Sequence, residues 1–327
     1  MSAGLPRVVA TNRVFPETLA LFDGRATLIA PEGEKPLSGP GLRLAMAEAE
    51  GMMAFMTDHV DADFLGFCPR LRVIGAALKG HDNIDLAAAQ RAGVSVCIVP
   101  DLLTVPTAEL AIGMMLALGR HVVAADRAIR TEGFEGWRPR FYGTGIADST
   151  VAVFGRGAVG RAIAARLAGF DCRIESWDPA EGGDAKTLAG LLAGADWVVL
   201  AAPLTHSNVH MINAEALARM KPGALLVNPA RGSLVDEEAV ADALESGRLA
   251  GYAADVFACE DLSLPDRPRA IPRRLAAPDA RTVLTPHIGS AVETVRRDIE
   301  WAAANAILEA LDGRIPPGLI AGPGIPC

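Results

Sequence analysis

Two patterns of apolar and polar residues alternate along this chain. Short runs rich in Val, Ile, Ala and Met predict buried strands, and longer stretches with apolar residues every three or four positions predict helices. The strands predicted in the first third of the chain are Arg7–Thr11, Met52–Met56, Leu71–Ala76 and Val94–Ile98. The helices predicted between them are Thr18–Phe22, Leu42–Glu50, Ala62–Phe67 and Leu86–Ala92, with a loop over residues 31–40. This order predicts a small domain built on a parallel sheet.

The alternation resumes at Thr150, after a long apolar helix predicted over Thr107–Arg130 and a Gly-rich aromatic loop over residues 133–145. The strands predicted in this second part are Val151–Phe154, Arg173–Trp177, Trp197–Ala201, Ala224–Asn228, Gly251–Asp255 and Val283–Thr285. The helices predicted there are Ala158–Leu167, Ala214–Met220, Glu237–Ser246 and Val292–Leu311. We therefore expect an α/β protein with two Rossmann-like, doubly wound parallel-sheet domains.

One of the two domains is expected to be discontinuous. The chain has 327 residues, which exceeds one compact core of ordinary size. The first domain has no closing helix of its own, so the last helix is expected to return to it. This predicts one domain from residues 1–103 and 290–327 and a second, inserted domain from residues 104–289. The Pro/Gly-rich tail after Leu311 is predicted to be irregular.

Charge and composition narrow the classes of function. The net charge of −8 argues against a nucleic-acid-binding protein, so any anion site must be a local cluster of cations. The N-terminus has no long apolar stretch typical of a signal peptide, and no apolar run of membrane-spanning length is free of charged or turn residues. We expect a cytoplasmic protein with no membrane association.

The cysteines predict no metal site. Neither a CxxC motif nor any other metal-binding spacing occurs among Cys68, Cys97, Cys172, Cys259 and Cys327. They are expected to be reduced thiols that fill space. Cys259 adjoins Glu260, so it is either a passive filler, which we favour, or a thiol whose oxidation would disturb that glutamate.

The segment TVAVFGRGAVG over residues 150–160 predicts a dinucleotide site. Gly155, Gly157 and Gly160 stand in G-x-G-x-x-G spacing between a predicted strand and a predicted helix. The first glycine permits the tight turn, the second lets backbone N–H groups approach a pyrophosphate, and the third lets the helix pack on the strand. Asp178 ends the next strand, 18 residues after Gly160. A carboxylate there accepts hydrogen bonds from ribose hydroxyls and repels a 2′-phosphate, which favours NAD over NADP.

Three further strand ends carry reactive side chains. Arg231, Glu260 and His287 follow successive predicted strands, and ligands of open α/β sheets collect at such ends. An arginine fork holds an anion with two parallel hydrogen bonds. A histidine oriented by a carboxylate moves protons. Taken singly, the arginine could be a surface cation, the glutamate part of a solvated face and the histidine a turn cap.

At these segments the chain resembles the D-isomer-specific 2-hydroxyacid dehydrogenases. NPARGSLVDEEAV, GYAADVF and LTPHIGS are similar to the signature segments of that family, and the likeness covers essentially the whole chain. It implies a catalytic trio of Arg231, Glu260 and His287, a homodimer with an interface around residues 107–145, and Asp255 near the nicotinamide. The cofactor-binding positions that it implies, beside the three glycines and Asp178, are Thr107, Arg156, Ala158, Val159, Pro203, Asn228, Pro229, Ala230, Asp255, His287 and Gly289.

A narrower resemblance concerns the substrate. MMAFMTDHVDADFL, ALKGHDNID, VPDLLTVPTAELAIG and GWRPRFYGTG are similar to segments of the phosphonate (phosphite) dehydrogenases within that family. The substrate-binding positions implied are Met56, Lys79, Gly80, Pro106, Trp137, Tyr142, Arg231, Ser290 and Arg296, the two aromatic residues reaching across from a partner subunit. This sequence departs from the pattern at Asp178, where that group has a glutamate. The segment directly after Glu260 and the tail after Leu311 also diverge, and nothing is carried over for these two segments.

The function expected is NAD-dependent oxidation of phosphite to phosphate. Phosphite approaches two negative charges near neutral pH, so two converging cations, Lys79 and Arg231, suit it better than the single arginine that a monocarboxylate needs. One alternative is a 2-hydroxyacid dehydrogenase acting on glyoxylate, hydroxypyruvate or D-lactate with the same trio. Another is an NAD(H)-sensing regulatory protein with little turnover.

Overall fold

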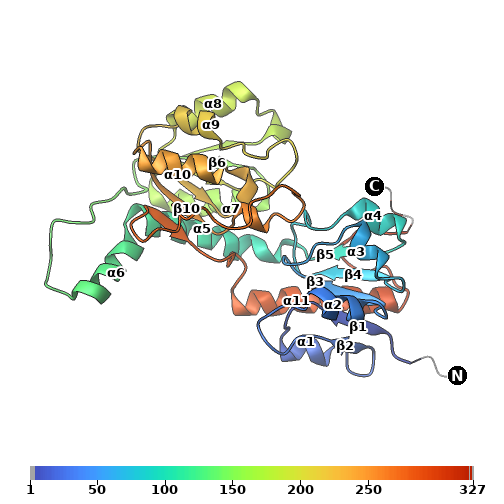
Figure 1. Cartoon of the computed structure of the whole chain (residues 1–327). Helices are drawn as coiled ribbons and strands as arrows, with labels where there is room; N and C mark the ends of the chain where they lie inside the picture. The colour runs from blue at the N-terminus through green and yellow to red at the C-terminus, as the bar shows by residue number, and fades with distance from the viewer. Residues whose placement is uncertain (1–3, 324, 326–327) are drawn as a thin grey trace. The chain divides into compact units, whose positions relative to one another are not determined.

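The computed structural model describes residues 4–323 and 325, and the chain forms two compact units (Figure 1). The first unit takes the ranges Met1–Leu103, Leu262–Pro265 and Ala291–Cys327, and the second takes Thr104–Asp261 and Asp266–Ser290. Each unit contains one six-stranded sheet with helices on both faces, so the predicted α/β class with two Rossmann-like units is confirmed.

The first unit has strand order β12-β5-β4-β3-β1-β2. Its strands are β1 (Arg7–Ala10), β2 (Thr27–Ile29), β3 (Gly51–Ala54), β4 (Val73–Ala76), β5 (Ser95–Ile98) and β12 (Leu319–Ala321). All neighbours pair in parallel except β12, which runs antiparallel to β5. Its helices are α1 (Pro16–Ala20), α2 (Gly39–Met46), α3 (Ala62–Gly66), α4 (Leu86–Arg91), the 3₁₀ helix η1 (Asp101–Leu103) and α11 (Glu293–Leu311).

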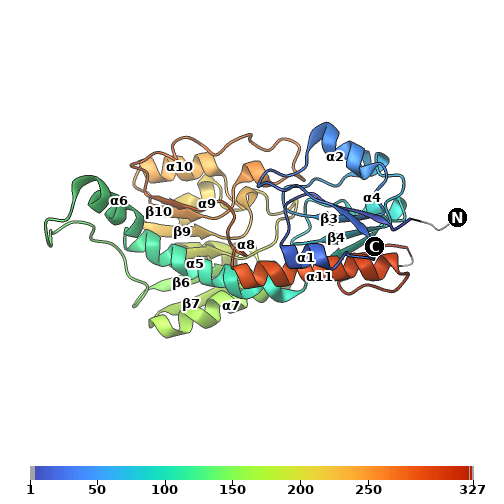
Figure 2. The same cartoon turned by 90° about the horizontal axis from the view of Figure 1, so that it is seen from below.

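The long helix α11 closes one face of the first sheet, beside α1 (Figure 2). It packs on β3, β4 and β5, with Ile299, Ala303 and Ile307 in the core. Glu300 is buried and accepts a hydrogen bond of 2.9 Å from the backbone N–H of Phe15, next to α1. Helices α2, α3 and α4 supply the apolar side chains on the other face. The last helix thus returns to the first unit.

The second unit has strand order β11-β10-β9-β8-β6-β7, all parallel. Its strands are β6 (Thr150–Phe154), β7 (Arg173–Trp177), β8 (Trp197–Leu200), β9 (Ala224–Asn228), β10 (Leu249–Ala254) and β11 (Thr282–Leu284). Its α-helices are α5 (Thr104–Gly119), α6 (Val122–Glu132), α7 (Ala158–Leu167), α8 (Ala185–Gly194), α9 (Ala214–Arg219) and α10 (Glu237–Glu245). Its 3₁₀ helices are η2 (Ala168–Phe170), η3 (Pro179–Glu181), η4 (Gly232–Leu234) and η5 (Ala258–Glu260).

Strand alternation divides the core of the second unit into two layers. Ala152 and Phe154 of β6 pack against the layer that includes α8, α9 and α10. Val151 and Val153 pack against the layer that includes α5 and α7. Because successive strand residues point to opposite faces, a continuous apolar run is what a sheet covered on both sides requires.

The helix predicted over Thr107–Arg130 is two helices, α5 and α6. His121, between them, has a φ of 53° in the left-handed region, which interrupts the helical hydrogen bonds. Gly119 is the last residue of α5. A Cβ at Gly119 would lie 2.7 Å from the Trp197 ring, and the Gly119 carbonyl accepts a hydrogen bond of 2.8 Å from the N–H of Thr144. The contacts of Gly119 with Trp197 and with the loop at Thr144 therefore end α5. The apolar pattern of the sequence alone does not predict this end.

Two short strands and one α-helix were also not predicted. Strands β2 and β12 have three residues each, too few to give an alternating pattern, and β12 lies in the tail that was predicted to be irregular. Helix α8 begins with a capping box in which Asp184 and Thr187 exchange hydrogen bonds. Helix α2 also begins inside the predicted loop, at Gly39.

One helical segment, Asp101–Gly119, is long and apolar enough to span a membrane. Its α5 part contributes Ala111, Met114 and Met115 to the core of the second unit, and α5 contacts α7, β9, β10 and β11. This apolar composition is that of a core helix.

Gly75 provides a test of how closely α11 packs. A Cβ at Gly75 would lie 2.6 Å from the carbonyl oxygen of Ala303 in α11, so Gly75→Ala forces the helix away from β4. We expect this substitution to lower the free energy of unfolding by about 2–3 kcal/mol, measured by urea denaturation. The control is Gly41→Ala in α2, where a Cβ meets nothing within 4 Å. That change should raise stability by about 0.5–1 kcal/mol. Equal stability of Gly75→Ala and the wild type would contradict the close contact.

Candidate active site

The carboxyl ends of the six parallel strands in the second unit lie along one edge of its sheet. Ligands of such sheets bind at this edge. One predicted site feature follows each strand from β6 to β11, in the order glycine turn, Asp178, Pro203, Arg231, Glu260 and His287. Pro203 is exposed, and its carbonyl accepts a hydrogen bond of 2.8 Å from the Asn208 amide.

The glycine turn after β6 is shaped for close backbone approach. Gly155 has a φ of 106°, and a Cβ there would lie 2.5 Å from the carbonyl oxygen of Ala201. A Cβ at Gly160 would lie 1.9 Å from the carbonyl oxygen of Gly155. At Gly157, the N-cap of α7, a Cβ would meet nothing within 4 Å, and no side chain caps the helix. The open N-terminus of α7, with Arg156, Ala158 and Val159, therefore fits a dinucleotide pyrophosphate.

Asp178 ends β7 beside this turn. Its Oδ2 accepts a hydrogen bond of 2.7 Å from the N–H of Arg156, and its Oδ1 accepts one of 2.9 Å from the N–H of Ala180. The Arg156 guanidinium pairs with Glu181 at 2.5 Å. The carboxylate is thus fixed next to the glycine turn and fits the ribose of a bound dinucleotide.

Asn228 shapes the turn that carries Arg231. The Asn228 side chain is fully buried, donates to the carbonyl of Arg231 at 2.8 Å and accepts from the N–H of Ala230 at 3.1 Å. Pro229 lies buried between them. The half-buried Arg231 guanidinium also donates to the carbonyl of Ala230 at 2.9 Å. These bonds fix where the arginine leaves the backbone.

His287 and Glu260, which the sequence predicts as an acid–base pair, lie within hydrogen-bond distance of each other. The distance from Nδ1 of His287 to Oε2 of Glu260 is 2.8 Å. Oε1 of the same carboxylate accepts a hydrogen bond of 2.8 Å from the N–H of Phe257, so the carboxylate is fixed to its own turn. A carboxylate on Nδ1 leaves Nε2 of the imidazole to exchange protons with a substrate.

Asp255 holds the loop that presents His287. Its Oδ1 accepts hydrogen bonds from the Thr285 hydroxyl at 2.6 Å and the Ile288 N–H at 2.8 Å, and its Oδ2 accepts one from the Gly289 N–H at 2.8 Å. His287 itself has a φ of 55°, and its N–H donates to the Asp255 carbonyl at 2.8 Å. Burial raises the pKa of Asp255, while these hydrogen bonds act in the opposite direction. The residue predicted to lie near the nicotinamide is thus also the anchor of the histidine loop.

Thr107 reaches the same edge from α5. A Cβ on Gly289 would lie 3.2 Å from both the Thr107 hydroxyl and the Asp255 carboxylate, so these three residues are in close contact. Pro106 is buried and Ser290 is half-buried. The sequence missed Thr285, because a threonine after a strand carries no signal beyond its strand propensity.

Four predicted substrate residues belong to the first unit, near the carboxyl ends of β3 and β4. Met56 follows β3 and is half-buried, and Lys79 and Gly80 follow β4. The Lys79 ammonium pairs with the Asp101 carboxylate. Arg296 on α11 donates to the carbonyl of Ala77 at 3.4 Å, which brings a second cation to the end of β4.

A buried aspartate supports these loops and was not predicted. Asp58 accepts hydrogen bonds from the Thr11 hydroxyl at 2.5 Å and the Phe55 N–H at 2.7 Å. Asn83 donates to the carbonyls of Asp58 and Phe55 at 2.7 and 3.1 Å. Burial raises the pKa of Asp58 to about 6. The network ties the residues around Met56 to the loop after Gly80.

Trp137 and Tyr142 are exposed residues of the second unit. They belong to the loop after α6, which projects from the rest of the second unit, and their exposed fractions are 78 and 75 % (Figure 1).

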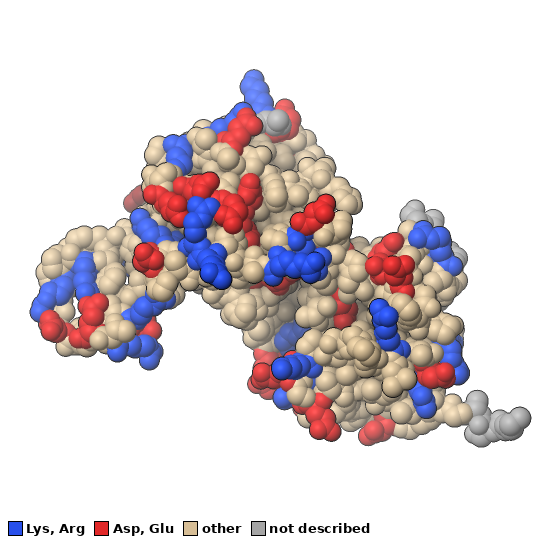
Figure 3. All heavy atoms as spheres, viewed as in Figure 1, with Lys and Arg blue, Asp and Glu red and all other residues tan. Residues whose placement is uncertain are grey.

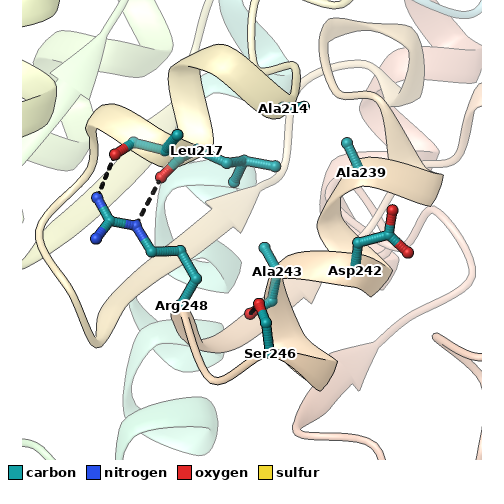
Figure 4. A pocket seen from close by; sticks show the side chains of 8 residues that line it. Ala214, Leu217, Ala239, Asp242, Ala243, Ser246 and Arg248 are labelled. Carbon is teal, nitrogen blue, oxygen red and sulfur yellow. Dashed lines mark hydrogen bonds between the residues drawn. The ribbon is translucent and has the colours of Figure 1, made fainter.

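A groove in the second unit and the face of the molecule drawn in Figure 3 lack such a group of polar residues. A groove of about 490 Å³ between α9 and α10 is lined mainly by alanines, Leu217 and Ser246, and its Arg248 is bonded to the carbonyls that end α9 (Figure 4). On the face drawn in Figure 3, acidic and basic side chains are interspersed. Among residues 4–323 and 325, no three His, Cys, Asp or Glu side chains are grouped to hold a metal.

Cys259 is a half-buried free thiol. Burial raises its pKa, and the nearby Glu237 and Glu260 raise it further, which disfavours the reactive thiolate and supports the space-filling role favoured from the sequence. Cys68, Cys97 and Cys172 are also free thiols, whereas Cys327 lies outside the described residues.

We expect Asp255→Asn to release the His287 loop. In the wild type, Oδ1 of Asp255 accepts from the N–H of Ile288 and Oδ2 accepts from the N–H of Gly289. In either orientation, the NH₂ group of the new asparagine would face one of these two N–H groups, at a cost of about 2–3 kcal/mol. Hydrogen exchange should become faster at the amides of Ile288 and Gly289. Asp279→Asn, an exposed change before β11, is the matched control. Unchanged protection of the two amides in Asp255→Asn would show that the carboxylate does not anchor the loop.

Comparison with known proteins agrees with this geometry. Residues 112–289 match the model of the D-isomer specific 2-hydroxyacid dehydrogenase NAD-binding domain. A glyoxylate reductase of Pyrococcus horikoshii is 33 % identical, with 96 % of each chain covered. The crystal structure of the TT0316 protein from Thermus thermophilus is similar with a TM-score of 0.86 and 32 % identity, covering 96 % of this chain and 100 % of the other. An NADPH-dependent glyoxylate/hydroxypyruvate reductase from Sinorhizobium meliloti, in complex with NADP and malonate, has a TM-score of 0.81 and 26 % identity, with 97 % of each chain covered. The chain therefore belongs to the D-isomer specific 2-hydroxyacid dehydrogenase family and is an NAD(P)-dependent oxidoreductase.

Proposed function

We propose that this enzyme oxidises phosphite to phosphate with NAD⁺. The observation that carries the proposal is the pair of cations at the end of β4, Lys79 and Arg296, within segments that resemble the phosphite-oxidising group. A doubly charged oxyanion calls for more positive charge than a 2-keto acid. The ion pair between Lys79 and Asp101 is solvent-exposed and therefore weak, so an anion can replace the aspartate.

In this proposal the protein positions phosphite and removes a proton. Lys79 and Arg231 hold the phosphite oxygens, with Arg296 behind them as a further positive charge. Met56, Gly80, Pro106 and Ser290 line the remainder of the substrate site. His287, oriented by Glu260, accepts a proton from water through Nε2. The water oxygen forms a bond to phosphorus as the P–H bond breaks. The nicotinamide supplies the hydride acceptor when NAD⁺ is bound, so phosphite, water and NAD⁺ give phosphate, NADH and a proton.

A second candidate is reduction of a 2-keto acid such as glyoxylate or hydroxypyruvate. The names of the relatives favour it, since the curated proteins of about one-third identity are glyoxylate reductases. In that reaction His287 would donate its proton to the substrate oxygen and Arg231 would hold the carboxylate. Lys79 would then have no required partner on the substrate.

We propose NAD rather than NADP as the cofactor. Asp178 faces the place of the adenosine ribose, and its charge opposes a 2′-phosphate. The nearby Arg156, which could otherwise attract that phosphate, is paired with Glu181. The cofactor-binding set is the one named from the sequence, with the glycine turn, Thr107, residues 228–230, Asp255 and Gly289 as its main parts.

We also propose a cytoplasmic homodimer. The loop after α6 exposes Phe134, Trp137 and Tyr142, and α6 itself exposes Val122 and Ile129. Contiguous exposed apolar side chains of this kind mark interaction surfaces. A second copy that covers them would bring Trp137 and Tyr142 to the substrate of its partner.

The first assay compares substrates. Purified protein with NAD⁺ and phosphite should form NADH, whereas NADH with glyoxylate or hydroxypyruvate should react slowly. Lys79→Met should lower kcat/KM for phosphite by about 100-fold, because it removes a charge-assisted contact, and should affect glyoxylate less. His287→Asn should abolish turnover of either substrate while cofactor still binds.

Lys35→Met, an exposed change in the first unit, controls for the loss of a lysine. Turnover of keto acids alone would replace our proposal with the second candidate. Cofactor binding without turnover of any of these substrates would favour an NAD(H)-sensing protein.

Cofactor preference is tested at Asp178. Asp178→Ala should weaken NAD⁺ binding and strengthen NADP⁺ binding, each by about tenfold, because it removes both a ribose acceptor and the charge that repels the 2′-phosphate. Dissociation constants measured by calorimetry give the readout. Glu175→Gln on the same strand is the control. If NADP⁺ affinity did not change, Asp178 would not set the preference.

A further inference from the structure

Two turns of the second unit, η4 after Arg231 and η5, which ends at Glu260, pack backbone against backbone. A Cβ at Gly232 would lie 1.8 Å from the carbonyl carbon of Phe257, so only glycine fits there. Two buried carboxylates hold these turns, one between η4 and η5 and the other between η5 and α10. Asp261 accepts a hydrogen bond of 2.6 Å from the N–H of Ser233, and Glu237 accepts one of 2.8 Å from the N–H of Ala258.

Glu237 is the less expected of these two carboxylates. It lies in the first turn of α10 with 4 % of its surface exposed. Its Oε1 holds Ala258, whereas its Oε2 has no hydrogen-bond partner among the described residues. The hydrogen bond that this carboxylate does accept therefore comes from the backbone two residues before Glu260.

The surroundings of Glu237 carry negative charge. Glu260 and Asp261 face it from the η5 turn, and Glu238 adjoins it on α10. The Cys259 thiol and the hydroxyl of Tyr252 on β10 are the other titratable groups that feel its charge. Burial raises the pKa of Glu237 to about 7, and these carboxylates add to the effect. Glu237 thus changes charge in the pH range in which an ordinary histidine titrates.

We propose that Glu237 is a positioning residue that sets the proton affinity of the Glu260–His287 pair. It acts in two ways. Its hydrogen bond to Ala258 fixes the turn from which Glu260 reaches Nδ1 of His287. Its charge, when present, adds a negative group beside Glu260 and so favours the imidazolium form of His287. The inference rests on the acid–base role of His287 in the proposed function.

The sign of the effect follows from the charges. In Glu237→Gln the amide oxygen can still accept from Ala258, but the residue is neutral at every pH. The negative charge near the pair is lost, so His287 should release its proton more readily. We therefore expect the imidazolium form of His287 to be less populated in Glu237→Gln than in the wild type at the same pH.

The test measures His287 directly, without substrate. Histidine ring signals of the ¹³C-labelled full chain are followed by NMR from pH 5 to 9, and His287→Asn identifies the relevant signal. Glu237→Gln should shift the His287 midpoint downward, whereas Glu238→Gln should leave it in place. Glu238 is the matched control because it removes a charge from the same helix turn, where it pairs with Arg274 at 2.5 Å on the surface.

Equal His287 midpoints in the wild type and Glu237→Gln would overturn the proposal. Absence of turnover with every substrate would count against the proposed function, whereas the NMR shift would still decide the role of Glu237.

Discussion

The buried carboxylate of Asp255 is the contact on which the candidate site depends. His287 stands in the left-handed backbone region, which costs an ordinary residue roughly 1 kcal/mol. The structure keeps it there because Asp255 accepts from Thr285, Ile288 and Gly289 and its backbone accepts from His287. With the loop fixed, the imidazole meets Glu260, and that glutamate is in turn fixed by Phe257 and, through its turn, by Glu237. Each polar group in this series orients the next.

Small residues set how closely these polar groups can approach. Gly160 lies against Gly155, and Gly232 lies against Phe257, at separations that leave no room for a side chain. In the first case the result is a helix N-terminus open to an anion, and in the second it is a direct contact between the turns of Arg231 and Glu260. Function therefore depends on the absence of a Cβ at two turns as much as on the charged residues that follow them.

An acidic chain that binds anions must concentrate its cations locally. The net charge is −8, yet Lys79 and Arg296 gather at the end of β4 and Arg231 follows β9. Each has a protein partner in the structure: Asp101 for Lys79, and backbone carbonyls for Arg296 and Arg231. Exposed ion pairs are worth at most about 1 kcal/mol, so Asp101 holds Lys79 in place at little cost to a ligand that displaces it.

The sequence alone predicts the fold class, the succession of most strands along the chain, and the positions of Arg231, Glu260 and His287 after strand ends. It could do so because apolar periodicity and glycine spacing are local properties: the runs before Gly155 and after Gly160 predict a strand and a helix without reference to the rest of the chain. The sequence predicted that His287 pairs with Glu260, whereas the distance of 2.8 Å between Nδ1 and Oε2 comes only from the tertiary structure. The break of the long helix at His121, the strand β12 in the tail, and the roles of Glu237, Asp58 and Thr285 were decided by tertiary structure alone. These features depend on contacts between residues far apart in the chain, such as Gly119 with Trp197 or Glu237 with Ala258, and a buried glutamate has the same letter in the sequence as a solvated one.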